Sequence, residues 1–147
     1  MVNTQKKIKI RLPKNWEDIS NRNGNGPPTF IIGNKNEPGV LQISFVEYTG
    51  GVKPNPDFND LLILSENIGQ KNEFGQVTGK SSGPCKFGKY GTVEFTGTDF
   101  PYISVWHLSN GKDFVFATFI CSQNPTAAEL TDVKTILTNI RRKRWPF

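Results

Sequence analysis

The sequence predicts an α+β domain in which a twisted antiparallel β-sheet is flanked by helices on both faces. Three observations lead to this fold class. Several short segments alternate apolar with polar side chains, as half-buried strands do. Two longer segments combine helix capping signals with an apolar stripe. The last pair of strands carries large apolar groups on both faces, and such a sheet is stable only when both faces are covered.

The first predicted strand covers residues 6–12. Ile8, Ile10 and Leu12 share one face, while basic side chains occupy the other. This period of two is typical of a half-buried strand. Pro13 ends the strand because proline cannot donate to a hydrogen-bonded ladder.

Four more segments are predicted as strands, at residues 29–32, 40–48, 74–80 and 89–96. The Gly- and Pro-rich residues 20–28 precede the first of them and predict a loop. Only a short turn separates the first two segments, so we expect them to be antiparallel neighbours. The last two are separated by a Gly-rich turn with the sequence SSGPCKFG.

A helix is predicted from Asn55 to Gly69. Asn55 supplies an N-cap, Pro56 a first helical position with a fixed φ, and Gly69 a C-terminal stop. The inner stripe of this helix is predicted to comprise Phe58, Leu61, Leu62, Ser65 and Ile68.

The clearest local signal is a β-hairpin formed by residues 102–108 and 114–121. Asn110 and Gly111 are the preferred pair for a two-residue type I′ turn, in which cross-strand partners have numbers that sum to 221. One face then carries Ile103, Val105, His107, Phe114, Phe116 and Thr118, and the other carries Tyr102, Ser104, Trp106, Val115, Ala117 and Phe119.

The C-terminal helix has two candidate starts. Asn124 and Pro125 offer a cap and a first position, whereas Thr126 and Glu129 offer a capping box. The predicted inner side comprises Leu130, Val133, Leu137 and Ile140.

The 147 residues are enough for one domain, and we expect a single α+β domain over residues 1–147 with a short basic tail at 141–147. The formal net charge is +5. Four basic residues lie near each end of the chain, so the stretch from Leu12 to Ile140 has ten basic and 13 acidic residues, a balance of −3. The positive charge therefore indicates solvated ends, and nucleic-acid binding is not favoured.

The sequence predicts a soluble, cytoplasmic protein. No apolar run is long enough for a membrane-spanning helix, and the first residues lack the apolar core of a signal peptide. We therefore expect no membrane partner.

No catalytic constellation, metal site or cofactor site is predicted. Cys85 and Cys121 have no C-x-x-C spacing, and Cys121 and His107 belong to opposite faces of the hairpin, so reduced thiols are expected and a disulfide is left open. The acid nearest to His107 in sequence, Asp113, lies opposite Leu108 in the predicted register, and no G-x-S-x-G motif is present. GQVTGKS has three residues where a P-loop needs four.

Two features of the sequence, the C-terminal aromatic residues and two long polar segments, are not needed to form the predicted fold. Trp145 and Phe147 follow four basic residues, so their rings either pack back on the sheet or bind a partner. Two long polar segments, SNRNGNGPP and GGVKPNPD, are either flexible connectors or recognition loops.

The order of these segments resembles the PsbP-like group. The resemblance rests on an alternating first strand ending in LPKNW, a strand pair, a helix, antiparallel strands containing YISVWHLSNGKDFVFATFIC, and a terminal helix ending in ILTNI. Members include the extrinsic photosystem subunit, a Ran-binding nuclear import factor, DcrB-type bacterial proteins and adaptor chaperones of bacterial secretion. The resemblance implies an antiparallel sheet between helices, in a group whose members mostly bind other proteins. It transfers no metal or partner residue by position.

The leading functional hypothesis is a non-catalytic protein-binding module, either an adaptor or an immunity-type protein. The alternative is a small-molecule-binding domain or an enzyme that uses a sheet–helix crevice near His107. A third class, nucleic-acid binding through the terminal basic residues, predicts an affinity that falls steeply with salt. The candidate ligand or partner contacts are Trp16, Tyr102, Trp106, His107, Trp145 and Phe147.

Overall fold

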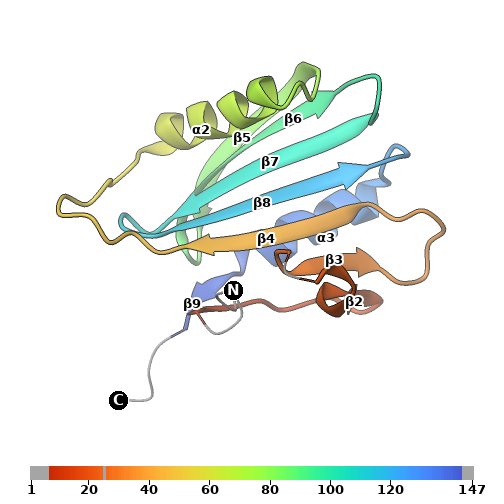
Figure 1. Cartoon of the computed structure of the whole chain (residues 1–147), viewed down its shortest axis with the longest axis horizontal. Helices are drawn as coiled ribbons and strands as arrows, with labels where there is room; N and C mark the ends of the chain where they lie inside the picture. The colour runs from red at the N-terminus through yellow and green to blue at the C-terminus, as the bar shows by residue number, and fades with distance from the viewer. Residues whose placement is uncertain (1–6, 25, 144–147) are drawn as a thin grey trace.

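The computed structural model describes residues 7–24 and 26–143, and its centre is a seven-stranded antiparallel sheet (Figure 1). The strand order is β2-β3-β4-β8-β7-β6-β5. The strands are β2 (Trp16–Asp18), β3 (Thr29–Ile32), β4 (Val40–Val46), β5 (Gln76–Cys85), β6 (Gly88–Thr96), β7 (Tyr102–Ser109) and β8 (Phe114–Cys121). Helix α2 (Phe58–Lys71) lies on one face of the sheet and α3 (Ala127–Thr138) on the other. The predicted fold class is confirmed.

The two faces of the sheet carry separate apolar clusters. Under α3, Val133, Ile136 and Leu137 pack with strand residues that include Trp106 and Phe119. Under α2, the fully buried residues are Val93, Phe95, Ile103 and Val105. The sheet is therefore the shared middle layer of a sandwich.

Helix α2 approaches the sheet closely because glycines lie at its contacts. A Cβ atom on Gly91 of β6 would lie 2.8 Å from Leu61 Cβ, and one on Gly69 of α2 would overlap the ring of Phe95. The helix starts later than predicted. Asp57 is the N-cap, because its side chain accepts from the Asp60 amide while Asp60 accepts from the Asp57 amide.

Helix α3 uses the second of its two predicted starts. Thr126 and Glu129 form a reciprocal capping box, with the Glu129 amide donating to Thr126 Oγ1 over 3.1 Å. The carboxylate of Glu129 is buried and also contacts Lys35 Nζ at 2.5 Å. Burial raises the pKa of Glu129, but the hydrogen bonds from Lys35 and Thr126 outweigh it and the net pKa is lowered.

The β7–β8 hairpin has the predicted faces in a different register. Paired residues have numbers that sum to 223, as in His107 with Phe116, instead of the predicted 221. The loop is longer because Asn110 Oδ1 accepts from the amides of Lys112 and Asp113. Within residues 110–113 only Gly111 has a positive φ, whereas a type I′ turn needs a positive φ at both central residues. A shift by two residues leaves every side chain on its predicted face.

The predicted strand at residues 74–80 and the turn after it also differ from the structure. β5 continues through Pro84 to Cys85, so the connection to β6 is shorter than SSGPCKFG. Pro84 is tolerated because β5 is the edge strand, where an amide is not needed for a ladder.

The two ends of the described chain form a second, two-stranded sheet. β1 (Ile8–Lys9) pairs with β9 (Arg141–Arg142), which begins the segment predicted as a basic tail. The predicted strand at 6–12 is therefore short, although Ile10 and Leu12 still pack against the core with Ile8. Two other elements were not predicted: strand β2, and the 3₁₀ helix η1 (Ser20–Asn23) inside the predicted loop.

Candidate functional site

Three of the candidate contact residues lie on the α3 side of the sheet, and their polar atoms are engaged within the protein. Trp16 Nε1 donates to Asp132 Oδ2 over 3.0 Å. Tyr102 Oη donates to Glu94 Oε2 over 2.5 Å, and burial followed by this carboxylate raises the pKa of Tyr102. Trp106 Nε1 donates to its neighbour Ser104 over 3.1 Å, so all three rings are held as parts of the core.

A small hollow lies beside Tyr102 and Trp106, bounded on the helix side by Leu130, Val133 and Lys134. Its volume of about 180 Å³ is below the range usual for small-molecule sites. The hydroxyl of Thr92, which also lines it, is buried without a hydrogen-bond partner among the described residues. The hollow is therefore suited to ordered water rather than to a ligand.

His107 lies on the opposite face, under α2. Its Nδ1 is 2.8 Å from Ser65 Oγ, and Ser65 Oγ donates to the carbonyl of Gly91 over 3.3 Å. The hydroxyl has one proton, so donation to Gly91 requires that Nδ1–H of a neutral imidazole donates to Ser65. Burial lowers the pKa of His107 to about 4, which keeps the ring neutral near pH 7.

The structure does not bring the predicted crevice residues together. Trp16, Tyr102 and Trp106 lie on the α3 side, while His107 is on the other face of the same sheet. In the part of the chain that the structure describes, no carboxylate pairs with His107. Asp113, which was predicted to lie opposite Leu108, is a loop residue that accepts from the Tyr48 amide. The remaining candidates, Trp145 and Phe147, lie outside the described residues.

The most prominent surface feature is a part of the sheet that α2 leaves uncovered. α2 packs on β5, β6 and β7, whereas β4 and β8 continue the same face without a helix above them (Figure 1). The expectation that both faces are fully covered is therefore corrected. We call this region the open sheet face; it is lined by Val46, Leu64, Ile68, His107, Phe114 and Phe116.

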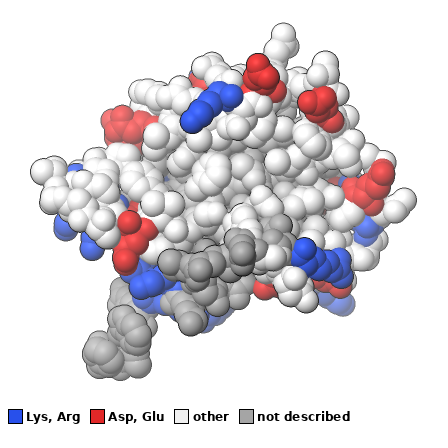
Figure 2. Space-filling model, in the orientation of Figure 1, with Lys and Arg blue, Asp and Glu red and all other residues white. Residues whose placement is uncertain are grey.

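The open sheet face is apolar and accessible. Val46 is 52% exposed and Leu64 is 38% exposed, and the hollow between them has a volume of about 340 Å³. His107 forms part of its floor, with its ring centroid 5.1 Å from that of Phe116. Figure 2, in the orientation of Figure 1, shows a wide uncharged area in the centre of the molecule, with charged side chains around its margin.

A second hollow continues the same strand pair toward its other end. Val40 and Ile120 are cross-strand partners, as are Val46 and Phe114 at the first hollow. The second hollow has a volume of about 350 Å³ and is bordered by the half-exposed ring of Phe100. The sequence contained one unused signal for this surface: two helices on opposite faces are too few to cover a sheet of seven strands.

Among the described residues, side chains of the metal-ligating types are scattered rather than gathered at one site. No cluster of three or more His, Cys, Asp or Glu side chains is present between residues 7 and 143, apart from the undescribed Asn25. Both cysteines are free, and burial, together with the nearby Glu129, raises the pKa of Cys121 to about 12. In the same part of the chain, no helix has the length and apolar character that crossing a membrane requires.

The fold places the protein in a structural class, the PsbP-like α+β sandwiches. A similar solved structure is that of cyanobacterial PsbP (CyanoP) from Synechocystis sp. PCC 6803, with a TM-score of 0.58 and 10% sequence identity over 97% of this chain and 91% of that one. A crystal structure from Bacteroides thetaiotaomicron aligns with a TM-score of 0.48 and 12% identity, over 98% of this chain and 48% of that one. No protein-family model and no curated protein matches the sequence. The predicted resemblance to the PsbP-like group is confirmed for the fold.

Proposed function

We propose that the protein is a non-catalytic protein-binding module, of the adaptor or immunity type, and that the open sheet face receives an amphipathic helix of its partner. The observation that carries the proposal is the uncovered apolar surface of β4 and β8 beside α2. A contiguous apolar patch with polar residues around it typically marks an interaction site, whereas single exposed apolar side chains do not.

The dimensions of the open sheet face favour a helix as the occupant. From Val40 to Val46 the strand extends about 20 Å, at roughly 3.4 Å per residue. α2 has 14 residues and so a length of about 21 Å, at 1.5 Å per residue. A partner helix packed about 8–10 Å from the axis of α2 would lie over β8 and β4, and would complete the layer that α2 begins.

The chemistry of the surface specifies the face of that helix. Leu64 and Ile68 present apolar groups along the side of α2, while Phe114 and Phe116 present rings from the strand. A partner stripe of leucine or similar residues would remove these groups from water, at about 25 cal/mol for each Å² buried. Gln42 lines the second hollow, where its side-chain amide donates to Thr29 Oγ1 over 3.4 Å and its amide oxygen can accept a hydrogen bond from the partner.

The state of His107 supports binding without catalysis. Ser65 is fully buried on α2, so its hydroxyl is not accessible to a substrate, and the neutral His107 has no carboxylate to orient it. A Ser–His pair without access or an orienting acid lacks the parts of an acyl-transfer site. We also propose a cytoplasmic location, for which the free thiols of Cys85 and Cys121 are a supporting observation, because disulfides are rare in a reducing compartment.

Site-specific photo-crosslinking in cells tests the proposal. A photoreactive phenylalanine analogue at Val46 or Leu64 is expected to capture the same partner, while the analogue at Val52, which is 83% exposed on a loop, is the matched control. A Leu64→Lys variant is expected to abolish capture from Val46. Equal capture at all three positions, or capture unaffected by Leu64→Lys, would contradict the proposal.

A further inference from the structure

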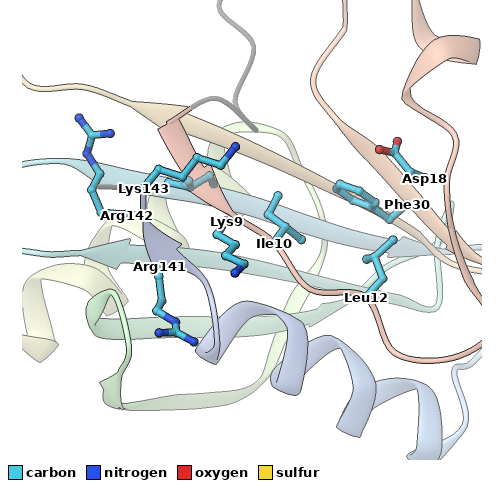
Figure 3. Close-up of a pocket in the computed structure, with 9 residues that line it drawn as sticks. Lys9, Ile10, Leu12, Asp18, Phe30, Arg141, Arg142 and Lys143 are labelled. Atoms are coloured by element: carbon cyan, nitrogen blue, oxygen red, sulfur yellow. The ribbon is translucent and has the colours of Figure 1, made fainter. Parts of the chain in front are cut away.

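We propose that a cleft at the β1–β9 pair binds an extended acidic peptide segment that also carries apolar side chains. The cleft, here called the basic cleft, has a volume of about 970 Å³ (Figure 3). Its lining residues are Ile8, Lys9, Ile10, Leu12, Asp18, Phe30, Arg141, Arg142 and Lys143. It is separate from the open sheet face, and the two proposals stand on different residues.

The pairing of the chain ends concentrates positive charge on one face of the ribbon. Lys9 and Arg141 are direct cross-strand partners, and the Lys143 amide donates to the Lys7 carbonyl over 2.8 Å. Because side chains alternate along a strand, Lys9 and Arg141 point away from the face that carries the buried Ile8. Figure 3 shows Lys9 and Arg141 close together at the ribbon end of the cleft.

The positive charge of Arg142 is neutralised by acidic residues of the protein itself. Its guanidinium lies 3.1 Å from Glu47 Oε2, 3.5 Å from Asp113 Oδ2 and 4.8 Å from the centre of the Phe45 ring. Within residues 7–24 and 26–143, by contrast, Lys9, Arg141 and Lys143 have no ion pair. The outward cations are thus available to an anionic partner, whereas Arg142 is committed to the fold.

Two like charges opposite one another are a cost to the folded protein. Directly opposed residues of an antiparallel pair have Cβ atoms about 4.5–5.5 Å apart, where like charges repel. Lys9 and Arg141 are such a pair, and both are exposed. A carboxylate placed between them would relieve this repulsion, so the ligand chemistry that fits is anionic.

The floor of the cleft indicates which kind of anion fits. Ile10 and Leu12 are partly exposed and offer an apolar strip between the cations and Phe30. Phe30 is only 1% exposed, so it offers no ring face on which a base could stack, and this disfavours a nucleic acid. Asp18 lies at the far end of the cleft, where its carboxylate accepts hydrogen bonds from Ser20. Because like charges repel, the carboxylates of a bound peptide are expected to lie away from Asp18, at the β1–β9 end.

Fluorescence anisotropy with labelled synthetic probes tests the proposal. The first probe is a ten-residue peptide that alternates Glu with Leu, and its control alternates Gln with Leu. We expect the Glu peptide alone to bind, and to bind more weakly as salt rises from about 0.1 M to about 1 M, where the Debye length falls from about 10 Å to about 3 Å. Equal binding of both peptides would overturn the proposal, as would tighter binding of a 12-nucleotide oligothymidine.

The Lys9→Glu variant distinguishes a binding role from a structural one. The variant creates an opposite-charge pair with Arg141, so we expect an unchanged or higher melting temperature. It also removes a cation from the cleft, so we expect the affinity for the Glu peptide to fall at least about twofold to fivefold. Lys134→Glu, on the exposed side of α3, is the matched charge control and is expected to preserve binding. An affinity loss no larger than that of Lys134→Glu would overturn the proposal. Photo-crosslinking from Val46 remains independent of Lys9, so the two proposals fail separately.

Discussion

Acidification should destabilise the protein through His107. His107 is 9% exposed, and burial lowers the pKa of its imidazole from 6.5 to about 4. Between these two values the unfolded chain binds a proton that the folded protein excludes, so stability falls as pH decreases and is fully retained above about pH 6.5. The shift corresponds to about 3 kcal/mol in total, of which about 1.4 kcal/mol is lost by pH 5.5 and nearly all by pH 4.

Urea denaturation of the wild type and of His107→Asn at pH 7.5, 5.5 and 4 measures this effect. Asparagine is chosen because its amide can still donate to Ser65, as Nδ1–H does. Asp and Glu side chains titrate in both proteins, so the difference between the two pH profiles isolates His107. If wild type and variant lose the same free energy between pH 7.5 and 4, the assignment of His107 as a buried neutral ring is wrong.

Three further substitutions test the packing. Gly91→Ala places a Cβ 2.8–2.9 Å from atoms of Leu61 and Leu62, so it should lower the free energy of unfolding by about 1–3 kcal/mol in urea denaturation. The control Gly51→Ala meets no atom within 4 Å and should change that free energy by less than about 0.5 kcal/mol. Thr126→Ala removes the α3 cap and should lower stability by about 1 kcal/mol, and no loss in thermal unfolding would count against the capping box. Trp16→Phe keeps an aromatic group but removes the five-membered ring of the buried indole and its hydrogen bond to Asp132. We expect a loss of about 1–2 kcal/mol or more in chemical denaturation, and an unchanged midpoint would show that neither contributes to stability.

Local signals in the sequence predicted most elements of the fold. The 29–32 strand has the predicted bounds. Helix α3 begins at the Thr126–Glu129 capping box, which is one of its two predicted starts. These features depend on neighbours within a few residues, and propensity and periodicity report such interactions directly. The α2 start was misplaced because Asn55 and Asp57 are both good caps. The choice was made by the Asp57–Asp60 reciprocal bonds, while Asn55 takes a φ of 42° and donates its amide to the distant Gly111.

The pairing of the ends could not be predicted from local patterns. β1 and β9 are each two residues long, and their partners lie at opposite ends of the chain. The sequence showed two basic ends; only the fold places Lys9 beside Arg141. The same limit applies to the open sheet face, because alternation specifies which residues share a face of β4 but not whether a helix lies above them.

For the candidate contact residues too, the sequence predicted the strand face of a side chain but not its contacts in the fold. Trp16, Tyr102 and Trp106 are candidates to line a sheet–helix crevice, but the polar atoms of their side chains are satisfied within the protein. His107 was correctly separated from Cys121 by the alternation of the hairpin, which holds even though the register differs. Its contact with Ser65 joins α2 to β7, and no spacing in the sequence encodes such a contact.

The strand order of the sheet has a consequence for how the protein folds. β5, β6, β7 and β8 follow one another as a meander, and among the described strands of this sheet the only neighbours that are not consecutive are β4 and β8. Contacts between segments close in sequence cost less loop-closure entropy, so the meander can form early, while the β4–β8 ladder must wait for the chain between them to close. The β4–β8 pairing, which forms late, also lies beneath the open sheet face. Amide hydrogen exchange should therefore show β4 opening before β6 and β7, and a partner helix bound across β4 and β8 should slow that opening.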